Sequence, residues 1–333
     1  MSAVGGVTAF GPSLVDLSVR LSPHAFREWC ATIGAGPGEW RAVPDWAAVN
    51  RLVGRLLGAS VPPGREFAAL TTPGSPVVLS AGSSTFGMLS AMPERLRRRA
   101  TYVSALADND PFSDFFAAAV GDLRVAHQNV VVAGHNPVSF VVYAADAPDR
   151  VLATYAGVAA TAMPPVDPTA ELLLVDTYEL RAVDELIRAR VVPVGLSLGN
   201  AGILTNTVRR RIRSYLDDGL LTMVFGNVAE YQALFPEVPA SLDGFRTHPV
   251  RRSVRFCLLT DGERGLAAHC DQNFARTDAR RAVTVMNTSG AGDTAAGAFV
   301  AGVLDGLAPA EILARCAELA ARVLAVPGSR IVG

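Results

Sequence analysis

One glycine-rich turn contains the residues of this chain that are best suited to chemistry. It reads Gly290-Ala291-Gly292-Asp293 and leads into the small residues 295–300, which are typical of a tightly packed helix. Small residues leave the backbone N–H groups at a helix start free to bind an anion, which the helix dipole also favours. A carboxylate at Asp293 would repel that anion, but it is well placed to take a proton from an attacking hydroxyl. The turn therefore predicts a phosphate-transfer site.

The composition excludes several classes of enzyme. No lysine occurs among the 333 residues, so all 30 basic side chains are arginine. A P-loop NTPase and a protein kinase each need a lysine at the phosphates, and Schiff-base chemistry needs an amine. A different phosphate-binding device is therefore required.

Charge and cysteine spacing suggest where the protein works. The net charge is −1, so no basic surface for nucleic acid is expected, and 50% of the residues are hydrophobic, which is ample for a core. The 4 cysteines and 5 histidines lack the spacing of a zinc site. Neither a signal peptide nor an apolar run of about 20 residues is evident. We expect a reduced, cytoplasmic protein without membrane partners, either a monomer or a homodimer.

β-rich and helical stretches alternate along the chain, and these elements must position the glycine-rich turn. They predict an α/β fold in three layers, α/β/α, around a mostly parallel sheet, with residues 1–333 as one domain. Core strands are expected at 4–10, 77–80, 101–105, 172–175, 191–196, 221–225 and 254–260. Helices are expected at 46–57, 85–92, 111–120, 182–190, 205–217, 228–234, 291–304 and 309–324.

One region breaks this alternation. The β-rich pieces 129–133, 138–143 and 150–155 follow one another without a helix, which predicts a small antiparallel sheet. Parts of 12–45 and 126–162 are expected to form a β-sheet lid over the carboxyl ends of the core strands, where open α/β sheets bind ligands. An edge meander without a lid function is the alternative.

With these elements in order, the sequence resembles the ribokinase-like, or PfkB, family of small-molecule kinases over nearly its whole length. Asn287 to Asp293 is similar to the family signature Asp-Thr-x-Gly-Ala-Gly-Asp. The resemblance implies that the backbone of Gly290, Ala291 and Gly292 forms an anion hole for the γ-phosphate of ATP, and that Asp293 is the catalytic base. The alternative is a glycine turn with a helix-capping aspartate.

Two motifs near the N-terminus resemble the substrate side of the family site. Residues 11–16, Gly-Pro-Ser-Leu-Val-Asp, are similar to its Gly-x-x-x-x-Asp, which implies that Asp16 accepts hydrogen bonds from acceptor hydroxyls. Residues 81–84, Ala-Gly-Ser-Ser, resemble its glycine-rich substrate loop, which implies acceptor contacts at Gly82 and Ser83. Taken alone, each stretch could be an ordinary turn.

Two later motifs resemble the nucleotide side. The stretch from Asn227 to Glu230 is similar to the family's Asn-x-x-Glu, which implies that both residues act near Mg²⁺ and the phosphates, Glu230 through water. Residues 260–265 resemble its Thr-x-Gly-x-x-Gly, which implies nucleotide contacts at Thr260, Gly262 and Gly265. A helix start and a hairpin turn are the respective alternatives.

Three positions depart from the family pattern. Phe86 stands where many members carry an asparagine that contacts sugar hydroxyls, so Phe86 is expected either to face an apolar part of the acceptor or to lie in the core. Asn287 replaces an acidic residue near a monovalent cation, which puts potassium activation in doubt. Both glycines of the family's Gly-x-Asp-x-x-Gly region are missing around Asp110, which leaves that residue a structural or lid role.

The expected function is that of a Mg²⁺- and ATP-dependent kinase. Its acceptor would be a hydroxymethyl group of a nucleoside or nucleoside-like sugar, because the spacing between Gly11 and Gly82 is closer to adenosine kinase-like members than to compact ribokinases. A sugar or polyol kinase of the same family and a non-catalytic sensor of a sugar or nucleotide are the alternatives. A dehydrogenase is disfavoured because no Gly-x-Gly-x-x-Gly follows the first strand.

Overall fold

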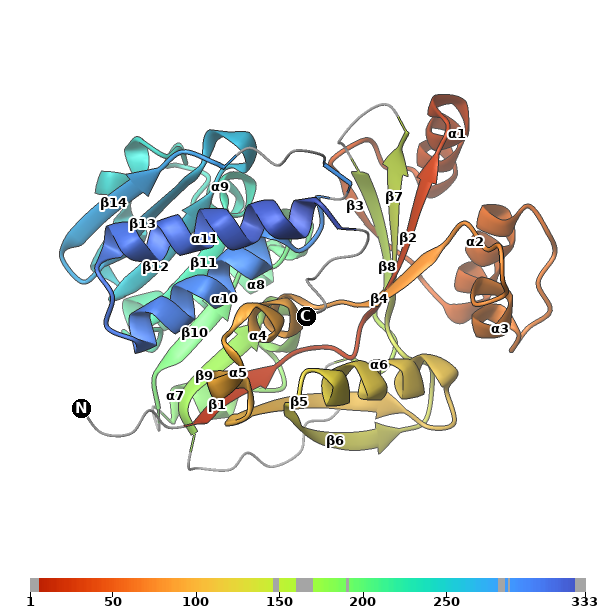
Figure 1. Cartoon of the computed structure of the whole chain (residues 1–333), viewed down its shortest axis with the longest axis horizontal. Helices are drawn as coiled ribbons and strands as arrows, with labels where there is room; N and C mark the ends of the chain where they lie inside the picture. The colour runs from red at the N-terminus through yellow and green to blue at the C-terminus, as the bar shows by residue number, and fades with distance from the viewer. Residues whose placement is uncertain are drawn as a thin grey trace.

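Two β-sheets organise the chain (Figure 1). The computed structural model describes residues 6–145, 150–159, 170–189, 192–280, 285–286 and 288–326. Within them no helix is both long and apolar enough to cross a lipid bilayer. Asn287 lies outside the described residues.

The larger sheet has nine strands in the order β14-β13-β12-β11-β10-β9-β1-β5-β6. Neighbours from β6 to β12 are parallel, and β13 and β14 extend the sheet in antiparallel fashion. The strands are β1 (Gly6–Phe10), β5 (Ala100–Ala107), β6 (Ala126–Val132), β9 (Ala170–Asp176), β10 (Val194–Ser197), β11 (Met223–Asn227), β12 (Phe256–Thr260), β13 (Leu266–Cys270) and β14 (Asn273–Thr277).

Helices cover both faces of this sheet. In β9, Leu172 and Leu174 pack into one apolar cluster, and the alternate residues Leu173 and Val175 pack into another. Successive side chains of a strand point to opposite faces of the sheet, so a parallel strand that is buried on both sides needs apolar residues at all of these positions. The first face is covered by α4 (Ser84–Ala91), α5 (Glu94–Arg97), α6 (Pro111–Asp122), α10 (Ala291–Leu304) and α11 (Pro309–Leu324), and the second by α7 (Asp184–Arg188), α8 (Asn206–Asp217) and α9 (Val228–Leu234).

The smaller sheet stands beside the larger one, with three helices on its outer side (Figure 1). The Trp29 ring contacts Phe140 with ring centroids 5.7 Å apart, which joins one of these helices to the sheet. Its strands are, in order, β3 (Trp40–Ala42), β8 (Arg150–Tyr155), β7 (Val138–Ala144), β2 (Val15–Leu21) and β4 (Val78–Ala81), and the helices are α1 (Pro23–Ile33), α2 (Trp46–Leu57) and α3 (Glu66–Leu70). Strands β7 and β8 are antiparallel, as are β2 and β4, whereas β2 is parallel to β7 and β3 to β8.

The predicted α/β class and the mostly parallel sheet are confirmed, but two strand assignments were wrong. Residues 77–80 were expected in the core, yet β4 pairs with β2 in the smaller sheet. Residues 129–133 were expected beside 138–143, yet β6 pairs with β5 at the edge of the larger sheet. Both errors have one cause: a short β-rich run shows that a strand forms, but its partner is chosen by contacts distant in sequence.

Candidate active site

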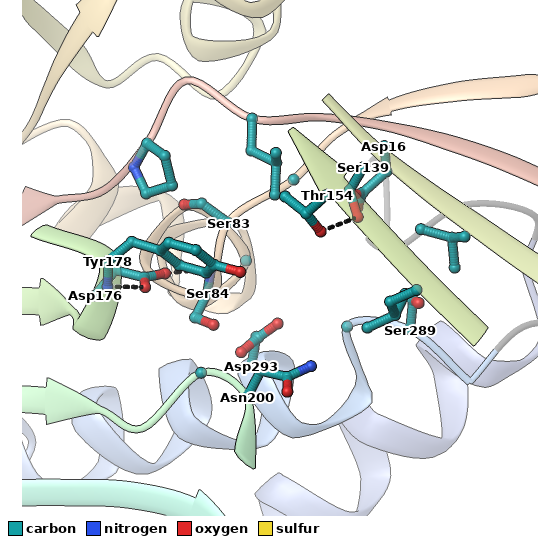
Figure 2. A pocket seen from close by; sticks show the side chains of 18 of the residues that line it. Asp16, Ser83, Ser84, Ser139, Thr154, Asp176, Tyr178, Asn200, Ser289 and Asp293 are labelled. Carbon is teal, nitrogen blue, oxygen red and sulfur yellow. Dashed lines mark hydrogen bonds between the residues drawn. The ribbon is translucent and has the colours of Figure 1, made fainter. Parts of the chain in front are cut away.

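A cleft separates the carboxyl ends of the larger sheet's strands from the inner face of the smaller sheet (Figure 2). Alternation along β7 creates this inner face, because Ser139 and Val141 line the cleft while Phe140 packs toward α1. The predicted residues that line the cleft are Asp16, Gly82, Ser83, Gly290 and Asp293.

The predicted anion turn opens α10. Gly290 is the residue before the helix and has φ of 78°, a left-handed conformation that favours glycine, and no side chain caps the helix there. The first intrahelical bond runs from the Thr294 N–H to the Gly290 carbonyl at 2.8 Å. The N–H groups of Ala291, Gly292 and Asp293 therefore have no acceptor within the helix, as a bound anion requires.

Close packing between α10 and α4 holds this turn in place. A Cβ atom at Gly297 would lie 2.1 Å from the Met88 carbonyl oxygen, and one at Gly87 would lie 2.8 Å from the Asp293 Cβ. Only glycine allows the two helices to approach this closely. The position of Asp293 is thus fixed by packing across the helix pair.

Asp293 lies in the first turn of α10 and reaches into the cleft (Figure 2). Burial raises the pKa of its carboxyl above the usual range, while the nearby Ser84 hydroxyl and the charge of Arg150 oppose that rise. A carboxylate with a raised pKa binds a proton more strongly, and a general base benefits from this as long as it remains ionised.

A second carboxyl group in the cleft, Asp176, was missed in the sequence. It is the last residue of β9, is 1% exposed, and accepts the backbone N–H groups of Ser84 and Tyr178, each at 3.1 Å. Burial, aided by the negative charge of Asp293, raises the pKa of Asp176 to about 6. Its position directly after the expected strand 172–175 could have identified it, since ligands bind at the carboxyl ends of such strands.

The pairing of β2 with β4 brings Asp16 to the substrate loop. A Cβ at Gly82 would lie 2.8 Å from Asp16 Oδ1, so the carboxylate rests against the bare backbone of this glycine. Ser83 follows with φ of 75°, and its hydroxyl accepts the Phe86 N–H at 3.2 Å and contacts the Tyr102 hydroxyl at 2.8 Å. The side chain of Ser83 therefore caps α4, and its backbone borders the cleft.

Phe86 lies in the hydrophobic core. Its side chain is 1% exposed, and its ring packs against Tyr102 and Phe116 with centroids 5.7 and 5.2 Å away. Of the two expectations for this position, the geometry supports the core residue. Asp110 likewise has a structural place, because its carboxylate accepts the Phe112 N–H at 2.8 Å and the Asn136 N–H at 2.9 Å.

Side chains of the smaller sheet hold the segment that leads into the anion turn. Arg150 Nη1 donates to Thr288 Oγ1 at 2.9 Å, and the Tyr143 hydroxyl donates to Ser289 Oγ at 2.9 Å. The Arg20 guanidinium lies 5.4 Å from the centroid of the Tyr143 ring. Sequence reasoning missed these residues, because neither a tyrosine nor an arginine in a strand indicates what it will meet across a cleft.

The predicted nucleotide residues meet at the carboxyl ends of β11 and β12. Asn227 and Thr260 are partners in the strand register, and a Cβ at Gly292 would lie 3.8 Å from Thr260 Oγ1. Gly265 has φ of 111°, and a Cβ there would lie 2.2 Å from the Thr277 carbonyl oxygen. Gly262, with φ of 54°, lies in the same β12–β13 turn. The positive φ angles at both positions favour glycine.

Glu230 forms a capping box with Asn227 at the start of α9. Glu230 Oε2 accepts the Asn227 N–H at 2.9 Å, and Oε1 accepts the Asn227 side-chain amide at 2.7 Å. Burial is the main cause that raises the pKa of Glu230 to about 7. In the part of the chain that the structure describes, no cluster of three or more His, Cys, Asp or Glu side chains is suited to a metal. Because hydrogen bonds from Asn227 occupy both carboxylate oxygens of Glu230, this side chain fits an ion held through water better than one bound directly.

Comparisons with known proteins agree with this geometry. Residues 92–332 match the family model described as pfkB family carbohydrate kinase. Adenosine kinase from Sinorhizobium meliloti has a TM-score of 0.78 at 19% identity, over 99% of this chain and 96% of that one. A probable sugar kinase protein from Rhizobium etli CFN 42 has a TM-score of 0.78 at 18% identity, over 98% of this chain and 94% of that one.

A solved structure of lower sequence identity shares the fold. Adenosine kinase from Schistosoma mansoni, solved with 2-fluoroadenosine, has a TM-score of 0.74 at 13% identity, over 99% of this chain and 98% of that one. Identities this low show a shared fold and nothing about the acceptor. No curated protein sequence matches the chain.

Proposed function

The chain belongs to the pfkB family of carbohydrate kinases, and we propose that it transfers the γ-phosphate of ATP to a hydroxymethyl group of a nucleoside or nucleoside-like sugar. The observation that carries the proposal is the carboxylate of Asp293 beside the free N–H groups at the start of α10. A site that only binds phosphate gains nothing from this carboxylate. A phosphotransferase needs both groups at one place.

Asp293 acts as the base in the proposed reaction. It takes the proton of the acceptor hydroxyl as the oxygen of that hydroxyl attacks the γ-phosphate. The backbone N–H groups of Ala291 and Gly292 stabilise the charge that develops on the transferred group. Arg150, which lines the same cleft and donates to Thr288, supplies a positive charge from the opposite wall. Positioning and charge stabilisation then provide most of the rate enhancement.

The acceptor is proposed to lie against the inner face of the smaller sheet. Asp16 would accept hydrogen bonds from its hydroxyls, with Gly82 allowing close approach. Trp40 and Tyr178 also line the cleft, and in this proposal their rings would stack on a planar base. In this proposal the smaller sheet, with the strands from 12–45 and 138–155, is the lid.

The nucleotide is proposed to lie along the ends of β11 and β12. Thr260 lies near Gly292 of the anion turn, Asn227 is its partner in the strand register, and the β12–β13 turn with Gly262 and Gly265 follows at the same edge of the sheet. Mg²⁺ would neutralise charge on the phosphates when bound. Glu230 would hold it through water, because hydrogen bonds from Asn227 already occupy its carboxylate.

A sugar or polyol kinase with the same chemistry is the second candidate. The likeness to the probable sugar kinase protein from Rhizobium etli is as strong as that to the Sinorhizobium meliloti adenosine kinase, which keeps this candidate open. The aromatic side chains of Trp40 and Tyr178 favour the nucleoside.

The test is ADP release with ATP and Mg²⁺ across nucleosides, pentoses, hexoses and polyols. Wild type should turn over one acceptor class, and Asp293→Asn should lose at least about a hundredfold in kcat, the contribution of a general base. Asp305→Asn is the matched control, because Asp305 follows the other end of α10 and pairs with Arg95 outside the cleft. Full turnover in Asp293→Asn would refute the assignment of the base.

A further inference from the structure

Three side chains of β8 mark out the length of the cleft. Arg150, Leu152 and Thr154 all line it, and the residues between them point to the other face of the smaller sheet. Arg150 donates to Thr288, just before the anion turn. Thr154 lies four residues farther along the strand, which is about 13 Å at about 3.3 Å per residue. The cleft thus runs from the proposed phosphate end, at Arg150, to a far end at Thr154.

Trp40 stands at this far end. It is the first residue of β3, which pairs with β8 at the edge of the smaller sheet, and it also lines the cleft. Its indole N–H donates to Thr154 Oγ1 at 3.1 Å, which fixes one edge of the ring to the smaller sheet. The side chain is half-buried, so it lies at the rim of the cleft.

The other edge of the indole meets the opposite wall of the cleft. Gly202 lies in η2 (Ala201–Ile203), which follows β10 of the larger sheet, and a Cβ there would lie 3.0 Å from Trp40 Cε3 and 3.3 Å from Trp40 Cβ. Nε1 and Cε3 lie on opposite edges of an indole, so the ring spans the cleft from β8 to η2. The φ of Gly202 is not positive, so the turn itself does not require glycine. The missing side chain serves the approach of the ring.

Hydrogen bonds hold the turn against which the ring rests. Asn200 Oδ1 accepts the Gly202 N–H at 2.7 Å, and the Asn200 carbonyl accepts the Ile203 N–H at 3.2 Å. Figure 2 shows Asn200 on this wall of the cleft and Thr154 on the wall that the smaller sheet forms. The indole is therefore in contact with a hydrogen-bonded element on each wall.

An indole placed across the cleft limits the room for a ligand. We propose that Trp40, held between Thr154 and Gly202, ends the acceptor site and sets the largest acceptor that the kinase phosphorylates. The inference rests on the proposed function, in which the hydroxymethyl group lies at Asp293 and the rest of the acceptor extends along β8. A longer acceptor has to break the contact of Trp40 with Gly202. The class that fits is an unsubstituted nucleoside or a shorter sugar, and nucleosides with a bulky group on the base are rejected.

A pair of acceptors that differ in length tests the proposal. The pair is the fastest acceptor of the panel and its analogue with a benzyl group at the end remote from the hydroxymethyl group. Wild type should prefer the parent by at least about tenfold in kcat/KM, since one methylene in excess already costs about 10- to 200-fold. In Trp40→Leu this ratio should fall at least about tenfold, because the shorter side chain leaves Gly202 and opens the site. Trp40→Phe, with its smaller ring, should give an intermediate ratio.

Gly202→Ala tests the contact from the opposite wall. The added Cβ displaces the ring by a few tenths of an ångström, so the acceptor KM should rise about two- to fivefold while the KM for ATP stays unchanged. In Trp40→Leu the methyl group has no ring to displace, and Gly202→Ala should change the KM there by less than about 1.5-fold. The methyl group also lies 3.1 Å from Asn200 Oδ1 in both backgrounds, so the comparison isolates the ring. Equal effects in the two backgrounds overturn the proposed contact.

Two further measurements separate the size limit from other causes. Trp46→Leu removes a tryptophan of α2 whose ring stacks on His135 with centroids 4.1 Å apart, and it should leave the ratio unchanged. Calorimetric titration without ATP should show the same preference in Kd and its loss in Trp40→Leu. An unchanged ratio in Trp40→Leu overturns the size limit, and the proposed function then still stands if Asp293→Asn is inactive. If Asp293→Asn is fully active while Trp40→Leu changes the ratio, the assignment of the base fails and the size limit stands.

Discussion

The two ends of the cleft are built in different ways. The end that we propose to bind the phosphates consists of consecutive residues, 290–293, whose backbone N–H groups and one carboxylate form a unit at the start of α10. The proposed acceptor end draws single side chains from separate strands, among them Asp16 of β2, Trp40 of β3 and Ser139 of β7. A local unit can keep its chemistry while the other end changes, so phosphoryl transfer and acceptor choice can vary independently.

The first prediction breaks the phosphate end. Gly297→Ala places a Cβ 2.1 Å from the Met88 carbonyl oxygen, so α10 must move away from α4 and take Asp293 with it. We expect kcat to fall more than about tenfold and the free energy of unfolding to fall by about 1–3 kcal/mol, as in other overpacked sites. Urea unfolding and ADP release measure the two effects.

Gly121→Ala is the control for this change. Gly121 is also a helical glycine, but a Cβ there meets nothing within 4 Å. It should leave kcat unchanged and raise stability by about 0.5–1 kcal/mol, because alanine is the better helix former. Equal behaviour of the two alanine variants would mean that the contact between α4 and α10 does not position the site.

The second prediction breaks the link between the two ends. Tyr143→Phe removes the hydroxyl that donates to Ser289 across the cleft at 2.9 Å. A buried hydrogen bond is worth about 0.5–1.5 kcal/mol, so kcat should fall about two- to tenfold if the bond holds the turn for transfer. The KM for the acceptor should stay unchanged.

A tyrosine at the other end of the β7–β8 pair provides the comparison. Tyr155 lies at the end of β8, and its ring packs on Trp46 with centroids 5.6 Å apart, away from the turn. Tyr155→Phe should behave as wild type. An effect of Tyr143→Phe on acceptor KM alone would place its role at the acceptor end instead.

The same contrast explains what the sequence could predict. The ranges of α9, α10 and α11 agree with the expected ones. Helix caps, small residues and the helical spacing of apolar residues are all signals within the segment itself. The turn at 290–293 was expected at the start of a helix for the same reason, and the structure has Gly290 directly before α10. Arg150 and Tyr143 were missed because they reach the turn only through pairing of distant strands, and β4 and β6 were misplaced for that reason. Asp176 was missed although its position directly after an expected strand is a local signal.

The third prediction sharpens the acceptor end. Thr154 Oγ1 accepts the Trp40 indole N–H at 3.1 Å and lies 3.0 Å from Ser139 Oγ, so it orients two side chains of the cleft wall. Thr154→Val keeps the shape and removes the hydroxyl. Loss of this network, worth about 0.5–1 kcal/mol, should raise the acceptor KM about two- to fivefold. The KM for ATP should not change.

Thr154→Ser restores the hydroxyl and should restore the wild-type KM. The two variants show which kinetic constant depends on Thr154. A change at the acceptor end should alter the acceptor KM and leave kcat unchanged. A fall in kcat at unchanged acceptor KM would show that Thr154 acts on the phosphate end, and the cleft would then work as one unit. The opposite result places acceptor choice in the smaller sheet, where a few hydroxyl positions on β7 and β8 could redirect the kinase without disturbing α10.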